Sequence, residues 1–278
     1  MMTKRRQLSA LIATSVATSV FAAQVAAAQN WPTRPVTMVV PFAAGSASDT
    51  VGRILGARLS EVLGQQVIIE NVSGAGGMTG VARVAKAPPD GYQIVLGGID
   101  TFAQSQSLYK RPLYNAVSDF APVGLLVEQP LVLVARKDLA PVKQDLIAGR
   151  IDYFCALAAA AMPLLASDSI RAIAIMTRDR SPLLPNLASA QEQGLTDLDS
   201  NFWSGFFVPK DTPAAVIERL HSAGVETLNT SAVAERLKTA GVTVVPADRR
   251  SSDYLRRFVE SEIAKWAVII KASGVSLD

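Results

Sequence analysis

The sequence contains one cysteine, Cys155, and one histidine, His221. A single cysteine excludes an internal disulfide, although disulfides are common in exported proteins. One histidine with one cysteine also excludes the usual zinc-ligand sets and makes a Ser-His-Asp triad hard to assemble. We interpret Cys155 as a small buried hydrophobic residue and His221 as a surface residue on a helix. No catalytic constellation remains, so we expect neither enzymatic activity nor a metal or cofactor.

The chain also lacks a surplus of one charge once its first residues are set aside. Lysine and arginine number 27, and aspartate and glutamate number 24, over 278 residues. Three of the basic residues, Lys4, Arg5 and Arg6, lie in the first 28 residues, which contain no acid. The remaining chain is balanced and has no long run of one charge. We therefore expect no nucleic-acid partner.

The first 28 residues are typical of a cleavable export signal. A basic start is followed by an apolar stretch at 8–23 and by three alanines at 26–28, which form a small-residue cleavage pattern. The apolar stretch is shorter than the roughly 20 residues that span a bilayer, although an anchoring helix remains an alternative. No later stretch is apolar for long enough. We predict a protein released into the periplasm, and we expect it to be a monomer.

The pattern of the remaining chain predicts an α/β fold. Short β-branched runs at 36–42, 66–72 and 93–96 are predicted strands, and amphipathic segments between them are predicted helices. This succession indicates a parallel sheet with helices on its faces. Further strands are expected at 123–127, 131–135, 151–157 and 170–176, and helices at 212–228 and 252–272. A hydrophobic content of 49% is enough for one large or two medium domains.

The first candidate site is the turn at 41–49, between the first strand and the first helix. In open α/β sheets, ligands bind beyond the carboxyl ends of the strands. Free N–H groups and the helix dipole favour an anion there, such as a carboxylate. The alternative is an ordinary turn with a capping serine or aspartate. The residues that we select as candidates are Phe42, Ala43, Ala44, Gly45, Ser46, Ala47 and Asp49.

A second glycine-rich turn follows the second strand at 73–80. It superficially resembles a dinucleotide-binding fingerprint, but Thr79 stands where the third glycine is required. We therefore interpret it as a compact turn that lets another element approach closely. Gly76 and Gly77 of this turn, and Asp100 and Thr101 after the third strand, are further candidates for the ligand site.

The sequence resembles the Bug/TctC family, the substrate-binding proteins of tripartite tricarboxylate transporters. Each match is short, but the ordered set covers nearly the whole mature chain. The matching segments are WPTRPV (31–36), VVPFAAG (39–45), LGQ (63–65), ENV (70–72), GAGG (74–77), PDGY (89–92), DFAP (119–122), AGRID (148–152), RAIA (171–174), WSG (203–205), PKDTPA (209–214) and KW (265–266).

The resemblance implies a periplasmic-binding-protein-like fold with two α/β domains around a cleft. Residues 29–103 and 206–278 are expected to form the first domain, and residues 104–205 the second. The family holds carboxylates on backbone N–H groups of the loop that matches 43–49, with Asp49 holding the loop. Asp100 stands where a small hydroxyl residue is expected. It either selects an amino group on the ligand or is a solvent-facing or capping acid.

The second domain departs from the family pattern. The resemblance implies a helix, a strand and another helix between 131–135 and 148–152, yet only residues 136–147 fill this interval. About 40 to 60 residues are absent, more than a loop trim explains. The family also usually places a polar residue near Cys155 and Ala156. We therefore expect the second domain to be truncated and poor in polar contacts.

Four functions remain open on the sequence. The preferred one is a solute-binding protein that delivers an organic acid or amino acid to membrane permease subunits. An internally deleted paralogue with weak or no ligand binding is the main alternative. A periplasmic sensor that presents its ligand to a receptor is the next. An exported α/β enzyme is disfavoured because no histidine-based constellation can be built.

Overall fold

The computed structural model describes residues 30–136, 153–196 and 198–277. The predicted export signal at 1–28 and the shortened connection at 137–147 lie outside the described residues. Among the described residues, no helix combines the length and apolar character that a membrane crossing requires.

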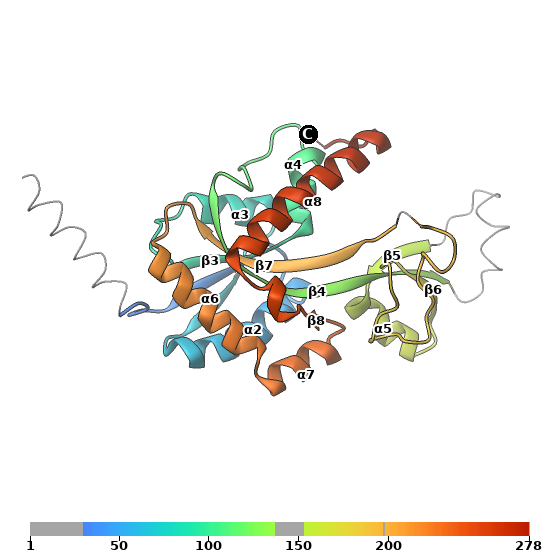
Figure 1. The fold of residues 1–278 in the computed structure, drawn as a ribbon, viewed down its shortest axis with the longest axis horizontal. Helices are drawn as coiled ribbons and strands as arrows, with labels where there is room; N and C mark the ends of the chain where they lie inside the picture. The colour runs from blue at the N-terminus through green and yellow to red at the C-terminus, as the bar shows by residue number, and fades with distance from the viewer. Residues whose placement is uncertain (1–29, 137–152, 197, 278) are drawn as a thin grey trace, which may run out of the picture.

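Three parallel strands form one half of the main sheet, as the sequence predicts. They are β1 (Val36–Val40), β2 (Val67–Asn71) and β3 (Gln93–Gly98), in the order β2-β1-β3. The crossover helices are α2 (Ala47–Leu63) and α3 (Met78–Ala85). These helices lie on opposite faces of the sheet (Figure 1).

Two long antiparallel strands extend the sheet beyond β3. Strand β7 (Asn201–Pro209) pairs with β3 on one side and with β4 (Phe120–Arg136) on the other. A short strand, β8 (Thr243–Val244), also pairs with β4. The sheet is therefore mixed rather than wholly parallel. Strand β7 was not predicted from the sequence, because Ser204 and Gly205 interrupt its apolar run.

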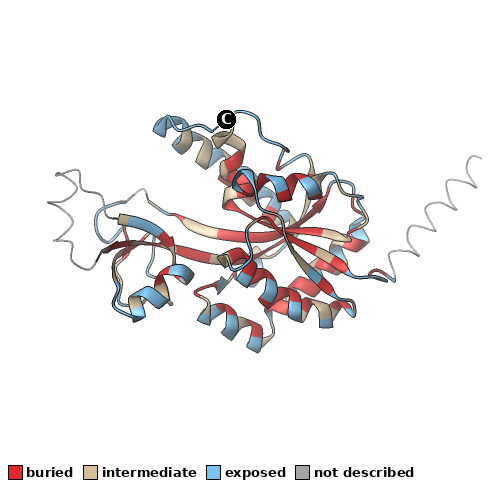
Figure 2. Cartoon of the chain, turned by 180° about the vertical axis from the view of Figure 1, so that it is seen from behind, coloured by how far each residue is buried: buried red, intermediate tan, exposed pale blue. Residues whose placement is uncertain are grey.

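Two apolar cores cover the two faces of this sheet. Helices α2, α6 (Ala214–Leu228) and α7 (Ser231–Thr239) enclose one core, which includes Leu59 and Leu220. The other face carries α3, the short segments η2 (Asp100–Gln104) and α4 (Ser105–Leu108), and the long helix α8 (Ser252–Ser273). Figure 2 shows the buried residues concentrated along the strands between these layers.

A smaller second lobe is built on the far end of β4. There, β4 pairs on one edge with β5 (Tyr153–Leu157) and on the other with β6 (Ile170–Ile175), and α5 (Ala158–Ala166) packs beneath them. Its core contains Val132, Val134 and Ile175. With one helix and three strands, the described part of this lobe is small, but it has an apolar core of its own.

The change from one lobe to the other falls inside β4 and not at residue 104. Tyr114, Phe120 and Leu125 belong to the core of the first lobe, and the second core begins with Val132. The two strands predicted at 123–127 and 131–135 are one continuous strand. Pro130 does not break it, because β4 exchanges partners there: Pro130 is its last residue paired with β7, and Leu131 is the first paired with β5.

Candidate ligand-binding cleft

The turn between β1 and α2 has a defined geometry. Ser46 is the N-cap of α2, and its hydroxyl accepts a hydrogen bond from the N–H of Asp49 at 3.2 Å. Gly45 has a φ of 82°, a left-handed conformation that glycine adopts without strain. Its N–H donates to the carboxylate of Asp49 at 2.8 Å. The turn is therefore fixed by two reciprocal contacts across the start of the helix.

Asp49 connects this turn to the neighbouring strand. Its side chain is almost fully buried and accepts hydrogen bonds from Arg53 and from Asn71, each at 3.0 Å. The amide of Asn71 also donates to the carbonyl of Phe42 at 3.0 Å. Burial acts to raise the pKa of Asp49, but the hydrogen bonds from Arg53, Gly45 and Asn71 outweigh it and hold the pKa below its ordinary value. Asp49 is thus a structural anion of the loop.

The second glycine turn packs directly behind the first. Gly77 has a φ of 93°, and a Cβ on it would lie 2.7 Å from the Cγ2 of Thr101 and 3.2 Å from the ring of Phe42. A Cβ on Gly76 would lie 2.6 Å from the hydroxyl of Tyr109. The prediction of a compact turn that admits another element is confirmed. Gly77, Phe42 and Thr101 are neighbours within one layer.

Asp100 and Thr101 begin the helical turn that follows β3. Thr101 is buried, and its hydroxyl accepts from the N–H of Gly98 at 3.1 Å. Asp100 is partly buried, and its Oδ1 accepts from the N–H of Thr101 at 2.7 Å. Burial raises the pKa of Asp100 from 3.8 to about 6, against the opposing effect of this hydrogen bond. Thr101 therefore stabilises the turn after β3, whereas burial disfavours the charged form of Asp100.

A cavity of about 450 Å³ lies between the two lobes, beside these loops. The first lobe contributes Ala47, Ile99, Asp100 and Gln104, and the second contributes Phe154, Cys155, Leu157 and Ala160; Leu131, Ser200, Phe202 and Trp266 complete the lining. The cavity is thus bounded by both lobes and by the strands that join them. Its volume falls within the range of small-molecule sites.

Two of the predicted site residues, Ala47 and Asp100, line this cavity directly. Three others, Phe42, Gly77 and Thr101, form the layer behind the turns, and Asp49 holds the first turn from below. The remaining predicted residues are absent from its lining: Ala43, Ala44, Gly45, Ser46 and Gly76. The aromatic residues Phe154, Phe202 and Trp266 were not predicted, since they come from distant segments and carry no local signal.

Cys155 corrects an expectation from the sequence. The residue is exposed and lines the cavity instead of being buried in the second lobe. In strand β5 only Ala156 is fully buried, and its neighbours Phe154 and Cys155 are exposed. Partial burial raises the pKa of the thiol. Cys155 is therefore an accessible group on the wall of the cleft.

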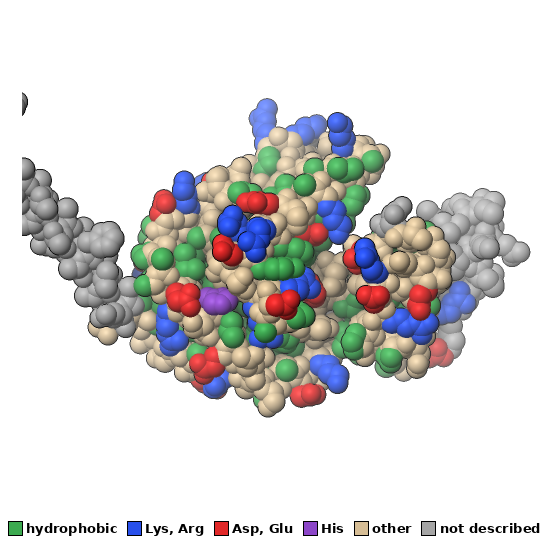
Figure 3. Space-filling model, viewed as in Figure 1, with side chains coloured by type: hydrophobic (Ala, Val, Ile, Leu, Met, Phe, Trp, Pro, Cys, Tyr) green, Lys and Arg blue, Asp and Glu red, His purple; other side chains and the backbone are tan. Residues whose placement is uncertain are grey.

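His221 lies on a helix and is visible at the surface, as the sequence predicts (Figure 3). It is partly buried on α6, where its Nδ1 lies 3.0 Å from the carbonyl of Val123 on β4. A Cβ on Gly124 would lie 3.1 Å from the same ring nitrogen. The histidine is a packing residue between helix and sheet and does not line the cleft.

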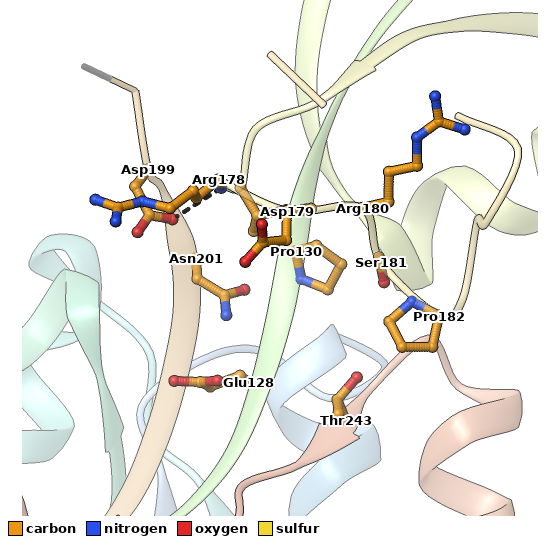
Figure 4. A pocket seen from close by; sticks show the side chains of 11 residues that line it. Glu128, Pro130, Arg178, Asp179, Arg180, Ser181, Pro182, Asp199, Asn201 and Thr243 are labelled. Carbon is orange, nitrogen blue, oxygen red and sulfur yellow. Dashed lines mark hydrogen bonds between the residues drawn. The ribbon is translucent and has the colours of Figure 1, made fainter. Parts of the chain in front are cut away.

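A second cavity, of about 520 Å³, lies on the other face of the strands that join the lobes (Figure 4). Pro130 and Asn201 line it, whereas their neighbours Leu131 and Phe202 line the first cavity. Side chains alternate between the faces of a strand, so the two cavities lie on opposite sides of β4 and β7.

The second cavity is more polar than the first. Glu128, Asp179 and Asn201 lie around its interior, and the guanidinium of Arg180 points away from it (Figure 4). Arg180 is bound to Glu192 at 2.9 Å on the surface of the second lobe.

On the broader surface seen in Figure 3, acidic and basic side chains are interspersed. The first cavity, beside the start of α2, is the better candidate for the ligand.

The structure has two α/β lobes that are joined by strands, with a cavity between them at the start of a helix. This is the architecture of a periplasmic solute-binding protein, whose lobes close around a ligand. The chain matches the profile of the tripartite tricarboxylate transporter family receptor, TctC, over residues 51–144 and 137–275. It belongs to this family of solute-binding proteins, which are not enzymes.

Individual relatives agree with this assignment. A UPF0065 protein from the TAR-I ttuE-ttuC' intergenic region of Agrobacterium vitis is 34% identical over 306 residues, which cover 90% of this chain and 88% of that protein. The periplasmic binding protein BugD has a TM-score of 0.79 with 29% identity, covering 88% of this chain and 99% of that one. MatC of Rhodopseudomonas palustris with bound malate has a TM-score of 0.78 with 30% identity, covering 86% and 100%.

The alignments also bear on the shortened second domain. The alignment with the Agrobacterium vitis protein runs over 306 positions, more than the 278 residues of this chain, so that relative has residues without a counterpart here. The two stretches that match the family profile meet at residues 137–144. The deletion that the resemblance implies, at residues 136–147, falls in the same interval.

Proposed function

We propose that this protein binds a small carboxylate-bearing metabolite in the periplasm and delivers it to the membrane permease subunits of a tripartite tricarboxylate-type transporter. The export signal predicted at 1–28 accounts for its location, and we expect a monomer. The observation that carries the proposal is the position of Ala47. This first residue of α2 opens onto the cavity between the lobes, where the helix N-terminus favours an anion.

The turn is expected to hold the carboxylate through its backbone, partly by way of water. The N–H of Gly45 and that of Asp49 are engaged within the turn. In the described chain, no hydrogen bond reaches the N–H groups of Ala47 and Ser48. A ligand carboxylate therefore has two unused donors at the start of α2. The malate bound to MatC supports a carboxylate as the ligand class.

Ligand binding is testable by thermal shift with a panel of mono-, di- and tricarboxylates and amino acids. A ligand present at 100 times its Kd stabilises the folded state by about 2.7 kcal/mol. The thiol of Cys155 supplies an independent readout, since it is the sole cysteine and lines the cavity. A bound ligand is expected to slow its alkylation at pH 8.5.

A paired variant separates binding from folding. Ala47→Glu places a negative charge at the first turn of α2, where it suits the helix dipole but repels a carboxylate. We expect the variant to fold normally and to lose the thermal shift. Ala57→Glu, at an exposed position of the same helix, is the matched control and should bind as the original chain does. Equal binding by both variants would place the ligand elsewhere.

The shortened second domain favours one competing function, a paralogue that has lost its ligand. In that case no member of the panel stabilises the chain or protects Cys155. A sensor differs from a transporter component in cells: deletion of the gene abolishes uptake of the bound acid only if the protein serves a permease.

A further inference from the structure

We infer that the cleft selects an α-amino acid with an apolar side chain, with the ligand ammonium on Asp100 and the ligand side chain against the aromatic wall. The inference rests on the proposed function and names the substrate class of the same cavity. It follows from three features of the described part of the cavity: the free N–H groups at the start of α2, a single carboxylate without a neighbouring cation, and a set of apolar side chains.

Among the described residues that line the cavity, Asp100 alone carries a formal charge at neutral pH, and no lysine, arginine or histidine accompanies it. Its Oδ1 is occupied by the N–H of Thr101. Within the described residues, only neutral groups donate to this carboxylate, and no cation pairs with it. Burying a charged carboxylate without a cation costs free energy. An ammonium group on the ligand offsets this cost best, because it can form a charge-assisted hydrogen bond to the carboxylate.

The absence of a cation from the described lining also argues against a second acidic group on the ligand. One carboxylate can use the N–H groups of Ala47 and Ser48. A second carboxylate would meet Asp100 or the apolar wall, without a compensating positive charge. A dicarboxylate such as malate therefore fits this lining poorly, although a relative in the same family binds it.

Most of the remaining lining of the cavity is apolar, and part of it is exposed. Phe154 of the second lobe is 69% exposed. Strand β5 contributes Phe154 and Leu157 to the lining, β7 contributes Phe202 and α8 contributes Trp266. Water against such rings is unfavourable, so a ligand with an apolar body gains by covering them. A zwitterion with an apolar side chain matches all three parts of the lining.

The test compares ligands that each lack one group. Each ligand is titrated into the protein separately. L-phenylalanine and L-leucine are compared with three compounds: 3-phenylpropionate, which has no ammonium; phenethylamine, which has no carboxylate; and malate. Isothermal titration and protection of Cys155 are read in parallel. We expect the amino acids to bind tightest and each truncated compound to bind at least tenfold more weakly.

Amino-acid substitutions test whether Asp100 binds the ammonium group of the ligand. Asp100→Asn keeps the shape of the side chain and removes its charge, and it is expected to weaken L-phenylalanine about ten- to hundredfold while leaving 3-phenylpropionate unchanged or tighter. Asp248→Asn, at an exposed position outside the cavity, is the control and should change neither ligand. Phe154→Ala is expected to weaken L-phenylalanine without affecting a small ligand such as glycine.

The outcomes separate the two proposals. If malate or 3-phenylpropionate binds tighter than the amino acids, or if Asp100→Asn leaves L-phenylalanine binding unchanged, the substrate class is wrong and the carboxylate-binding function stands. If no carboxylate and no amino acid binds, the proposed function itself fails.

Discussion

The carboxylate of Asp49 binds the N–H of Gly45, four residues earlier in the chain, at a distance of 2.8 Å. The contact closes the turn that begins α2. Because the same carboxylate also binds Arg53 and Asn71, the turn is attached both to its own helix and to β2. The N–H groups that we assign to the ligand therefore lie on a fixed frame.

Asp49→Ala is expected to weaken both this frame and ligand binding. The substitution leaves the donors of Gly45 and Asn71 without their acceptor, which costs about 1–3 kcal/mol. Because the pKa of Asp49 is lowered in the folded state, its contribution is present at neutral pH and is lost as the pH falls through the folded pKa. Urea denaturation at pH 7 and pH 3 measures this.

The control for Asp49 is Asp253→Ala. Asp253 is exposed and pairs with Arg256 on the surface of α8, so its loss should change stability little. A similar loss in both variants at pH 7, or a loss at Asp49 that persists unchanged in acid, would contradict the assigned role.

Strand β1 and helix α2 were predictable because the sequence signals that define them are local. The apolar strand, the serine cap and the glycine at position 64 fix β1 and α2 within a few residues. Strand β7 was missed because it is buried between β3 and β4 and lacks an alternating pattern. The aromatic wall was missed for a different reason: Phe154, Phe202 and Trp266 meet only in three dimensions.

Gly77→Ala is expected to destabilise the protein by about 1–3 kcal/mol. The position has a φ of 93°, and the new Cβ would lie 2.7 Å from Thr101. Gly64→Ala is the matched control, since Gly64 also has a positive φ, of 69°, but no heavy atom within 4 Å of the added Cβ. Thermal melts should show a larger loss at Gly77. Equal losses would mean that backbone strain alone, and not contact with Thr101, demands the glycine.

Glu262 is expected to hold the indole of Trp266, which lines the cleft. It is 7% exposed, and its Oε2 accepts from the indole N–H of Trp203 at 3.1 Å and of Trp266 at 3.3 Å. Glu262→Leu leaves both indoles without an acceptor and should cost about 1–3 kcal/mol. Glu262→Gln retains an acceptor and should cost less. Chemical denaturation and tryptophan fluorescence measure the effect, with the exposed Glu260→Leu as control; a large loss in the control would undermine the assignment.

The raised pKa of Asp100 predicts an unusual dependence of the free energy of unfolding on pH. Its pKa is about 6 in the folded chain against an ordinary 3.8, so the folded state retains a proton that the unfolded state releases between these values. Its contribution to stability therefore declines as the pH rises from about 4 to about 6 and is constant above. One pKa unit corresponds to about 1.4 kcal/mol, so the decline is at most about 3 kcal/mol.

Asp100→Asn should remove this decline in the ligand-free protein. The variant is expected to match the original chain at pH 4 and to exceed it in unfolding free energy at pH 7.5. The nearby titratable groups do not confuse the comparison, because burial raises the pKa of Tyr114 and of Cys155 and keeps both neutral over this range. Urea titrations at both pH values decide it. A difference that does not change between pH 4 and pH 7.5 would mean that Asp100 titrates normally and that its charge carries no cost in the empty cleft.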